Sequence, residues 1–413
     1  MSLPNKIAYI QAMQTHSFID TLNAINGQQR TMMSLLRSWA AINSESENLS
    51  GLSQMIAALE MQFLSLGGHM QRIDLPPRST IAIDGSPITI PHGQALHITK
   101  RPEAPIQIFL GGHMDTVYSP SHPFQKAEDL CENILRGPGV ADMKGGLIVM
   151  LTALKAFENH PSSKNVGWEI LINPDEEIGS IGSEQLFVAA AQRNHLGLIF
   201  EPSFADGALV SDRKGSANFS VVAKGLAAHA GRDFEKGRNA IAAIADFILR
   251  ASALSNKTKG ISVNVGQVLG GGPVNIVPDF ALCRLNMRAD AIEDFDETEA
   301  QLERITETPP EGVIMTLHLH QKRDPKPFDE KCKKLFNQLN ACAFEEGYSL
   351  ISRPSGGVCD GNILSAAGLP VIDSLGVIGG KLHTSDEYML IDSLVQRSRL
   401  TTLFLLRLAS IPK

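Results

Sequence analysis

The sequence predicts an α/β protein in which helices cover both faces of a mainly parallel sheet and a smaller domain is inserted into the chain. Three observations predict this class. Strands of the buried type alternate with helices after Ile106, the alternation breaks near Lys214, and it resumes after Pro325. With 413 residues, the chain is long enough for more than one domain of roughly 150 residues.

Composition excludes several classes of protein. Apolar residues make up 43% of the chain and charged residues 20%, which is typical of a packed globular protein. The net charge of −7 argues against nucleic acid or an anionic membrane as a partner, because both select a basic excess. The chain has no apolar run long enough to span a membrane, and its first ten residues lack the apolar core of a signal peptide. We therefore expect a cytoplasmic protein, or a periplasmic one if a signal peptide has been removed.

Hydrophobic periodicity places the elements of the first predicted domain. Residues 18–39 and 52–66 repeat apolar side chains at helical intervals, and Gly67 and Gly68 mark the end of the second helix. Strands and helices then alternate after some short β-like runs. The predicted strands are residues 106–110, 168–172 and 196–200, and the predicted helices are residues 145–157 and 183–191.

The inserted segment follows a different order. The pattern predicts strands at residues 219–223, 261–268, 281–287 and 313–320 and helices at residues 239–253 and 294–305. This β-α-β-β-α-β order is that of the ferredoxin-like unit. We therefore predict a catalytic domain made of residues 1–213 and 326–413, with residues 214–325 inserted as a domain of their own. Helices at residues 331–346, 361–367 and 393–409 and a strand at residues 370–375 complete the first domain.

Five short segments carry acidic or imidazole side chains directly after predicted strands. Open α/β sheets place their sites at this edge, so we expect these side chains to converge. The segments are residues 111–115, 137–146, 173–180, 200–202 and 379–387. Two histidines, His113 and His383, together with several carboxylates and no cysteine favour Zn²⁺ in a hydrolytic site. Each segment alone also has a structural interpretation; Glu176 and Glu177, for example, suit the start of a helix.

In this order, the five segments resemble metallopeptidase family twenty, the co-catalytic di-zinc exopeptidases and amidohydrolases. Members include glutamate carboxypeptidase of the carboxypeptidase G type, acetylornithine deacetylase and succinyl-diaminopimelate desuccinylase. The similarity to glutamate carboxypeptidase rests on Glu201, Asn275 and Arg288 occurring together, and the family resemblance extends from about Asn26 to Leu408. It implies a zinc-exopeptidase-like mixed sheet flanked by helices, with an inserted ferredoxin-like lid and dimerisation domain.

The resemblance implies two Zn²⁺ ions per subunit, for which Co²⁺ or Mn²⁺ can substitute. The implied metal ligands are His113, Asp142, Glu177, Glu201 and His383. Asp142 would bridge the two ions, with one histidine and one glutamate on each side. The ions, roughly 3.5 Å apart, would hold a bridging hydroxide and polarise the scissile carbonyl. The resemblance also implies a cis peptide bond between Asp142 and Met143.

Two acidic residues beside the ligands have catalytic roles by the same resemblance. Asp115 would accept the second N–H of the His113 imidazole and fix its tautomer. Glu176 would act as general base, taking a proton from the bridging water and delivering it to the leaving amine. We interpret Lys144, in contrast, as a surface lysine at a helix start.

The inserted domain carries a second set of candidates. His229, within residues 225–231, resembles a histidine that reaches the active site of the partner subunit and stabilises the oxyanion. Asn275 and Arg288 resemble the pair that binds the free carboxylate of the substrate, which a guanidinium fork matches well. Gly357 is expected to let the backbone approach the substrate. The alternatives are a loop histidine, a turn asparagine, a surface arginine and an ordinary loop glycine.

Together these residues predict a zinc-dependent hydrolase that cleaves an amide bond next to a free carboxylate. The expected substrate is a small peptide or an N-acyl amino acid, and the expected assembly is a homodimer formed through the inserted domain. An N-acyl-amino-acid deacylase and a dipeptidase are the alternatives among enzymes. Outside enzymes, the alternative is a metal-free scaffold that binds peptides without cleaving them.

Overall fold

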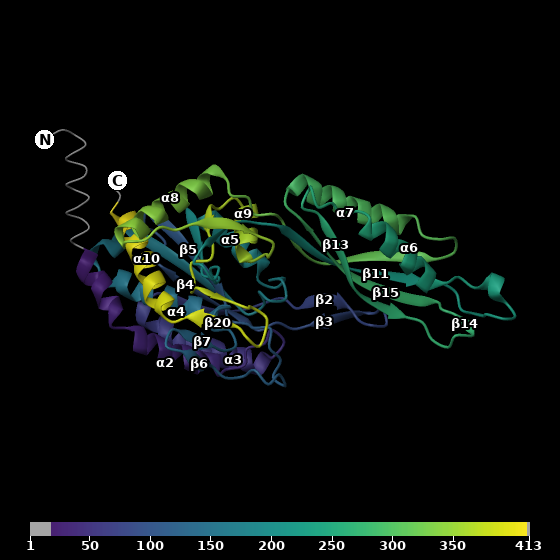
Figure 1. Cartoon of the computed structure of the whole chain (residues 1–413), viewed down its shortest axis with the longest axis horizontal. Helices are drawn as coiled ribbons and strands as arrows, with labels where there is room; N and C mark the ends of the chain where they lie inside the picture. Colours follow the sequence, from purple (N-terminus) through teal and green to yellow (C-terminus); the bar gives the residue numbers. More distant parts are fainter. Residues whose placement is uncertain (1–17, 411–413) are drawn as a thin grey trace.

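A computed structural model describes residues 18–410 of the chain as two lobes (Figure 1). Within these residues, the first lobe holds a sheet of six strands in the order β1-β4-β8-β5-β9-β18. The strands are β1 (His69–Asp74), β4 (Gln94–Lys100), β5 (Ile106–His113), β8 (Val166–Asn173), β9 (Leu196–Ile199) and β18 (Val371–Ile372). Neighbours from β8 to β18 are parallel, whereas β1 and β4 are antiparallel additions at one side. This mixed sheet confirms the predicted fold class.

The central strands β5, β8 and β9 of the first lobe bury both of their faces. Ile108 and Leu110 of β5 belong to one apolar core, and Phe109 between them belongs to another, because successive strand residues point to opposite sides. Helices cover both cores, as the alternation of strands and helices predicts. The first core is covered by α2 (Gln29–Ala40), α3 (Leu49–Phe63), α4 (Lys144–Glu158) and α10 (Asp392–Ala409), with α8 (Glu330–Glu345) against α10, and the second by α5 (Glu184–Arg193) and α9 (Asp360–Ala366).

The second lobe, residues 215–323, has its own sheet. Among the described residues this sheet has four antiparallel strands in the order β13-β15-β11-β16. The strands are β11 (Gly215–Lys224), β13 (Ser262–Gly270), β15 (Phe280–Ala289) and β16 (Ile314–Arg323), and α6 (Ala240–Ser252) and α7 (Ile292–Glu307) pack on one face over a separate apolar core. The predicted β-α-β-β-α-β order is present. The chain enters and leaves this lobe where Arg213 and Lys326 exchange backbone hydrogen bonds of 2.9 and 3.0 Å.

Sequence analysis assigned no bounds to several short strands, because two to five residues are too few to display a strand period. Those at residues 78–81 and 87–90 lie where short β-like runs are expected. Together, the short strands form a second, small sheet in the first lobe, a parallel pair, one hairpin, and one antiparallel pair of segments that are distant in the sequence. These strands are β6 (Glu128–Cys131), β7 (Ile134–Arg136), β19 (Gly379–Gly380) and β20 (Tyr388–Leu390); β10 (Leu209–Arg213) with β17 (Ser352–Ser355); β2 (Arg78–Ile81) with β3 (Pro87–Ile90); and β12 (Ala228–His229) with β14 (Ile276–Val277).

The structure corrects two expectations about the elements. Residues 18–39 are not one helix, since a turn at Gly27 and Gln28 separates a helix at residues 18–26 from α2. Of the predicted strand at residues 370–375, Val371 and Ile372 alone form a regular strand, which pairs with β9. Among the described residues, no helix is long and apolar enough to cross a membrane. The prediction about the chain start concerns residues that lie outside the described range.

The interpretation of Lys144 as a surface residue is wrong. Its side chain is 1% exposed, and Nζ donates to the carbonyl oxygens of Trp39 and Ile42 at 3.1 and 2.8 Å. Burial lowers the pKa of Lys144 to about 7. Lys144 therefore connects the start of α4 to the end of α2 through hydrogen bonds, two residues after Asp142 in the sequence.

Candidate metal centre

The five candidate ligands come together at the carboxyl edge of the first sheet. His113 is the last residue of β5, Glu177 follows β8, and Glu201 follows β9. These three strands are parallel neighbours, so their ends deliver the three side chains to one place. Asp142 comes from the loop before α4, and His383 from the loop after β19.

Two groups of ligand atoms share Asp142. Nε2 of His113 lies 3.1 Å from Oδ1 of Asp142 and 3.7 Å from Oε1 of Glu201. Nε2 of His383 lies 3.3 Å from Oδ2 of Asp142 and 3.1 Å from Oε2 of Glu177. Within each group, one ligand atom from each residue lies within 4.8 Å of the others. The two oxygens of Asp142 therefore face two different sets of donors.

Glu387 holds the backbone that carries Asp142. Its carboxylate accepts the backbone N–H groups of Ala141 and Asp142 at 2.9 and 3.1 Å, and the hydroxyl of Tyr118 donates to it at 2.8 Å. The peptide bond from Asp142 to Met143 is cis, which confirms that expectation. Sequence analysis did not select Glu387 or Tyr118; the only signal was that Glu387 ends one of the five acidic segments.

Asp115 supports both a ligand and the loop of the candidate base. Nδ1 of His113 lies 3.3 Å from Oδ1 of Asp115 and 3.0 Å from its carbonyl oxygen. The Asp115 carboxylate also accepts the backbone N–H groups of Glu176 and Glu177 at 3.2 and 3.1 Å, and the hydroxyl of Ser46 at 2.7 Å. An acceptor on Nδ1 directs Nε2 of the same ring toward the other ligands.

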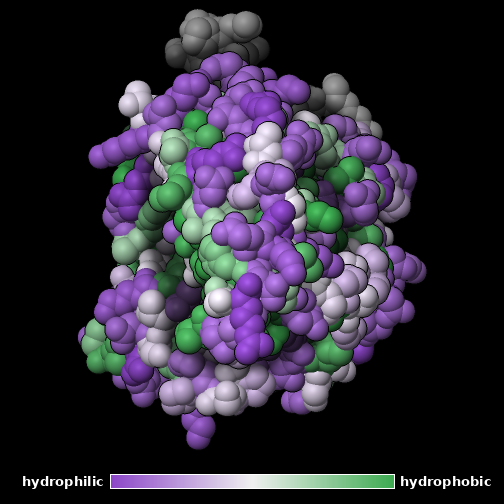
Figure 2. Space-filling view, turned by 90° about the vertical axis from the view of Figure 1, so that its right-hand side faces the viewer, coloured by the Kyte–Doolittle hydropathy of each residue, from purple (hydrophilic) through white to green (hydrophobic). Residues whose placement is uncertain are grey.

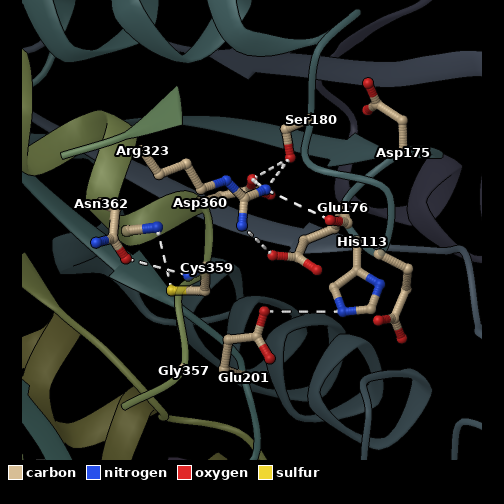
Figure 3. Close-up of polar contacts among 12 residues, drawn as sticks. His113, Asp175, Glu176, Ser180, Glu201, Arg323, Gly357, Cys359, Asp360 and Asn362 are labelled. Atoms are coloured by element: carbon tan, nitrogen blue, oxygen red, sulfur yellow. Dashed lines mark hydrogen bonds and ion pairs between the residues drawn. The ribbon is translucent and has the colours of Figure 1, made fainter. Parts of the chain in front are cut away.

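The candidate base Glu176 forms an ion pair with Arg323, the last residue of β16 in the second lobe. Nη1 of Arg323 lies 2.7 Å from Oε1 of Glu176, and Nη2 donates to Ser180 at 2.6 Å and lies 3.2 Å from Asp360 (Figure 3). Arg323 is 3% exposed. Sequence analysis missed Arg323, because no local pattern separates it from other arginines.

A cavity of about 440 Å³ opens beside the ligands. Its polar wall includes Asp142, Glu176, Glu177, Glu201, His383 and Gly357, and its apolar wall includes Phe204, Val210, Val358 and Leu382. Arg353 also lines the cavity, with its guanidinium 4.0 Å from the ring centre of Phe204. Arg213 lines it too and is held by an ion pair of 2.6 Å with Asp373. The cavity can therefore accept a group that has both an apolar and a charged part.

The candidates of the second lobe fall into two places. His229 and Asn275 are exposed neighbours, since β12 pairs with β14 and Ala230 donates to the carbonyl of Asn275 at 2.9 Å. Strand β14 lies at the far end of the second lobe, away from β5, so the structure does not bring these two residues to the ligands of the same chain (Figure 1). Arg288 instead donates from Nη1 to the carbonyl of Gly356 at 2.5 Å, beside the cavity wall.

Burial and mutual repulsion shape the protonation of the ligands. Burial and the charge of Asp142 raise the pKa of Glu177 to about 8 and the pKa of Glu201 well above its usual value. Hydrogen bonds to Asp142 and Glu177 raise the pKa of His383 to about 11. Burial opposes the charged form of His113, but hydrogen bonds to Asp115 and Asp142 outweigh it and raise its pKa well above the usual value.

This donor set fits a divalent cation. Imidazole nitrogen and carboxylate oxygen are suitable ligands, and thiolates are missing from both groups. Three carboxylates in one buried cluster repel one another, and a cation offsets that repulsion. The elevated pKa values of Glu177 and Glu201 express the same repulsion.

Comparison with known proteins decides the family. Residues 109–407 match the model of peptidase family M20/M25/M40. The chain belongs to this family. Carboxypeptidase G2 of Pseudomonas sp. (strain RS-16) is 32% identical over 299 residues, which cover 70% of this chain and 71% of that protein. Succinyl-diaminopimelate desuccinylase of Hahella chejuensis is 25% identical over 339 residues, which cover 75% of this chain and 84% of that protein.

Solved structures of other proteins share the fold. Human carnosine dipeptidase 1 has a TM-score of 0.70 at 14% identity, covering 95% of this chain and 99% of that one. The M20 metallo-carboxypeptidase Sso-CP2 of Sulfolobus solfataricus has a TM-score of 0.67 at 16% identity, covering 91% and 98%. The family model and the curated relatives confirm the sequence resemblance, and the chain is a metal-dependent hydrolase of the peptidase and amidohydrolase kind.

Metal binding is expected to release protons. In the metal-free protein the raised pKa values favour the protonated forms of His113, His383 and Glu177 at neutral pH, and a cation must displace these protons. Affinity for Zn²⁺ should therefore rise as the pH increases from about 6 through about 8. Calorimetric titration in two buffers of different ionisation enthalpy measures the protons released.

His383→Ala is the matched control for this titration, because it removes one protonated ligand and leaves the His113 group intact. It should release fewer protons than the unmodified protein. Equal heats in both buffers, or an affinity that falls as the pH rises, would contradict the account.

Proposed function

We propose that the chain is a two-zinc amidohydrolase that cleaves an amide bond next to a free carboxylate, in the manner of a carboxypeptidase. The observation that carries this proposal is the position of Asp142, whose two oxygens face separate groups of ligands. The 32% identity to carboxypeptidase G2 over 70% of the chain supports the carboxypeptidase activity.

In this proposal, His113 and Glu201 would hold one Zn²⁺, and Glu177 and His383 would hold the other. Asp142 would serve both groups, and the same oxygen and nitrogen donors would also accept Co²⁺ or Mn²⁺. When bound, the ions supply Lewis-acid polarisation of the scissile carbonyl.

The residues around the ligands carry out the proton transfer. Glu176 accepts a proton from the attacking water and delivers it to the leaving amine. Arg323, 2.7 Å from Oε1 of Glu176, fixes the direction of that carboxylate without entering the cavity wall. Asp115 keeps the tautomer of His113, and its bonds to the backbone of Glu176 keep the base near the ligands.

The substrate side of the proposal rests on the cavity. A volume of about 440 Å³ suits a small peptide or an N-acyl amino acid. Arg288, at the cavity rim, would bind the free carboxylate together with an Asn275 that reaches the site from a second copy of the chain, and Gly357 would present its backbone to the substrate.

A second candidate function is N-acyl-amino-acid deacylation, which the similarity to succinyl-diaminopimelate desuccinylase favours.

We also propose that residues 214–325 form a lid domain through which two copies associate. The second lobe exposes several large apolar side chains, which are Leu226, Phe234, Ile241, Leu249, Val268, Val274 and Ile276. Figure 2 shows this end of the molecule, where green apolar groups lie as separate patches among purple hydrophilic ones. Strand β13 is an edge of the four-stranded sheet and offers unpaired backbone groups to a second copy. In such a dimer, His229 would complete the site of the partner.

Replacing the base tests the function directly. Glu176→Gln keeps the size of the side chain but cannot accept a proton, so kcat should fall at least ~10²-fold. The metal content should stay unchanged, because Glu176 is not a ligand in the proposal. Turnover is measured on a panel of dipeptides and N-acyl amino acids with Zn²⁺, and metal content by elemental analysis.

Two control variants are needed to interpret the result for Glu176→Gln. Glu184→Gln, an exposed change in the first turn of α5, should keep both turnover and metal. Glu177→Gln should lose metal together with activity. Near-normal turnover of Glu176→Gln would remove Glu176 from the mechanism, and loss of its metal would make it a ligand. An unmodified protein that binds no metal and cleaves no member of the panel would favour the metal-free peptide-binding scaffold.

Subunit exchange tests the role of His229. Glu176→Gln and His229→Ala are each expected to be inactive, but a mixed dimer contains one site with an intact Glu176 and an intact His229 across the interface. Part of the activity should therefore return when the two proteins are mixed and exchange is verified by mass spectrometry. If exchange occurs and activity stays absent, His229 does not act across the interface.

A further inference from the structure

The β2–β3 hairpin of the first lobe packs on the open face of the second sheet, opposite α6 and α7 (Figure 1). Ile81 is 6% exposed and packs with Val222 and Leu282. Nη2 of Arg284, on β15, donates to the carbonyl of Ile81 at 2.6 Å. At the hairpin turn, a Cβ on Gly85 would lie 2.6 Å from the ring of Phe280. The hairpin therefore belongs to the first lobe by sequence but packs against the sheet of the second lobe.

Beside this contact lies a second cavity, of about 350 Å³. Three parts of the chain form it: the hairpin, the loop after Glu177, and the open face of the second sheet. It shares no lining residue with the cavity at the metal ligands. The lining polar groups are Arg78 and Thr80 of the hairpin and Asn218, Asn264, Gln267, Arg284, Asn286, His320 and Gln321 of the second lobe.

The charged side chains that line this cavity are all positive. Among the described residues that line it, none is acidic, whereas two are arginines. Arg78 forms an ion pair with Glu47 outside the lining, but within residues 18–410 no carboxylate pairs with Arg284. Burial and, after it, the positive charges of Arg284, His318 and Arg78 lower the pKa of His320.

Both arginines keep a hydrogen-bond donor without a partner. The Nε atoms of Arg78 and Arg284 are buried and make no hydrogen bond in the structure. A buried N–H that lacks an acceptor costs free energy, and it costs more on a cation. An anionic oxygen is the acceptor that satisfies guanidinium donors best, because the hydrogen bond is then charge-assisted.

We propose that this cavity binds a small molecule through an anionic oxygen group, a carboxylate or a phosphate, held between Arg78 of the hairpin and Arg284 of the second lobe. The amide side chains of Asn264 and Gln267, which are exposed on β13, supply further donors to the same ligand. The bound anion would join the hairpin to the second sheet, and the site is separate from the metal centre.

Calorimetric titration of the metal-loaded protein tests this site with two probes, inorganic phosphate and succinate. Because both anions also bind metal centres, variants assign the site. Arg284→Gln should weaken the binding of the probe at least about tenfold, since it removes a charged donor. Arg353→Gln, which changes an arginine of the other cavity, should leave this binding unchanged. The probe that binds more tightly identifies the source of the oxygen group.

Arg284→Gln also removes the hydrogen bond to Ile81 and could weaken binding by loosening the hairpin, so a second variant, Asn264→Leu, is needed. It fills the cavity from an exposed position on β13 and does not touch the bond between Arg284 and Ile81, so it should also weaken binding while the unfolding temperature stays unchanged. The proposal is overturned if neither probe gives saturable binding. It is also overturned if binding survives in Arg284→Gln and Asn264→Leu, because the anion then sits elsewhere.

Discussion

Three carboxylates, Asp142, Glu177 and Glu201, are gathered around only two imidazoles in a largely buried cluster, and the rest of the site depends on this concentration of negative charge. Without a cation, two of these acids favour the protonated form and the histidines hold protons against them. The surrounding residues act on the same cluster. Glu387 holds the backbone of Asp142 and Asp115 holds the loop of Glu177, so carboxylates outside the ligand set hold the backbone of two ligands in place.

The two lobes are connected at the site as well as along the chain. Arg323 ends a strand of the second lobe, yet its guanidinium orients Glu176 in the first. In the opposite direction, the β2–β3 hairpin leaves the first lobe and packs on the second sheet. A movement of the second lobe therefore acts on the candidate base and on the hairpin together. His229, at the far end of the same lobe, is the residue that such a movement or a second copy would have to bring to a site.

Sequence reasoning recovered the elements whose pattern is local. Helices and long strands repeat their apolar residues, and His113, Glu177 and Glu201 follow such strands directly, so their convergence could be predicted. Roles that arise from distant contacts could not be predicted. Arg323 meets Glu176 across 147 residues of sequence, and Glu387 meets Ala141 across 246. Lys144 looked like a surface residue because its burial depends on α2, which the local sequence does not contain. The short strands, the hairpin among them, display too few residues to show a period.

The central claim is that Asp142 joins two metal-binding groups. Metal content per chain, measured by plasma mass spectrometry after dialysis against Zn²⁺-free buffer, tests it most directly. The account predicts about two zinc ions in the unmodified protein, about one in Glu201→Ala and in Glu177→Ala, and close to none in Asp142→Ala. A single zinc ion in the unmodified protein, or an Asp142→Ala protein that keeps the full complement, would contradict it.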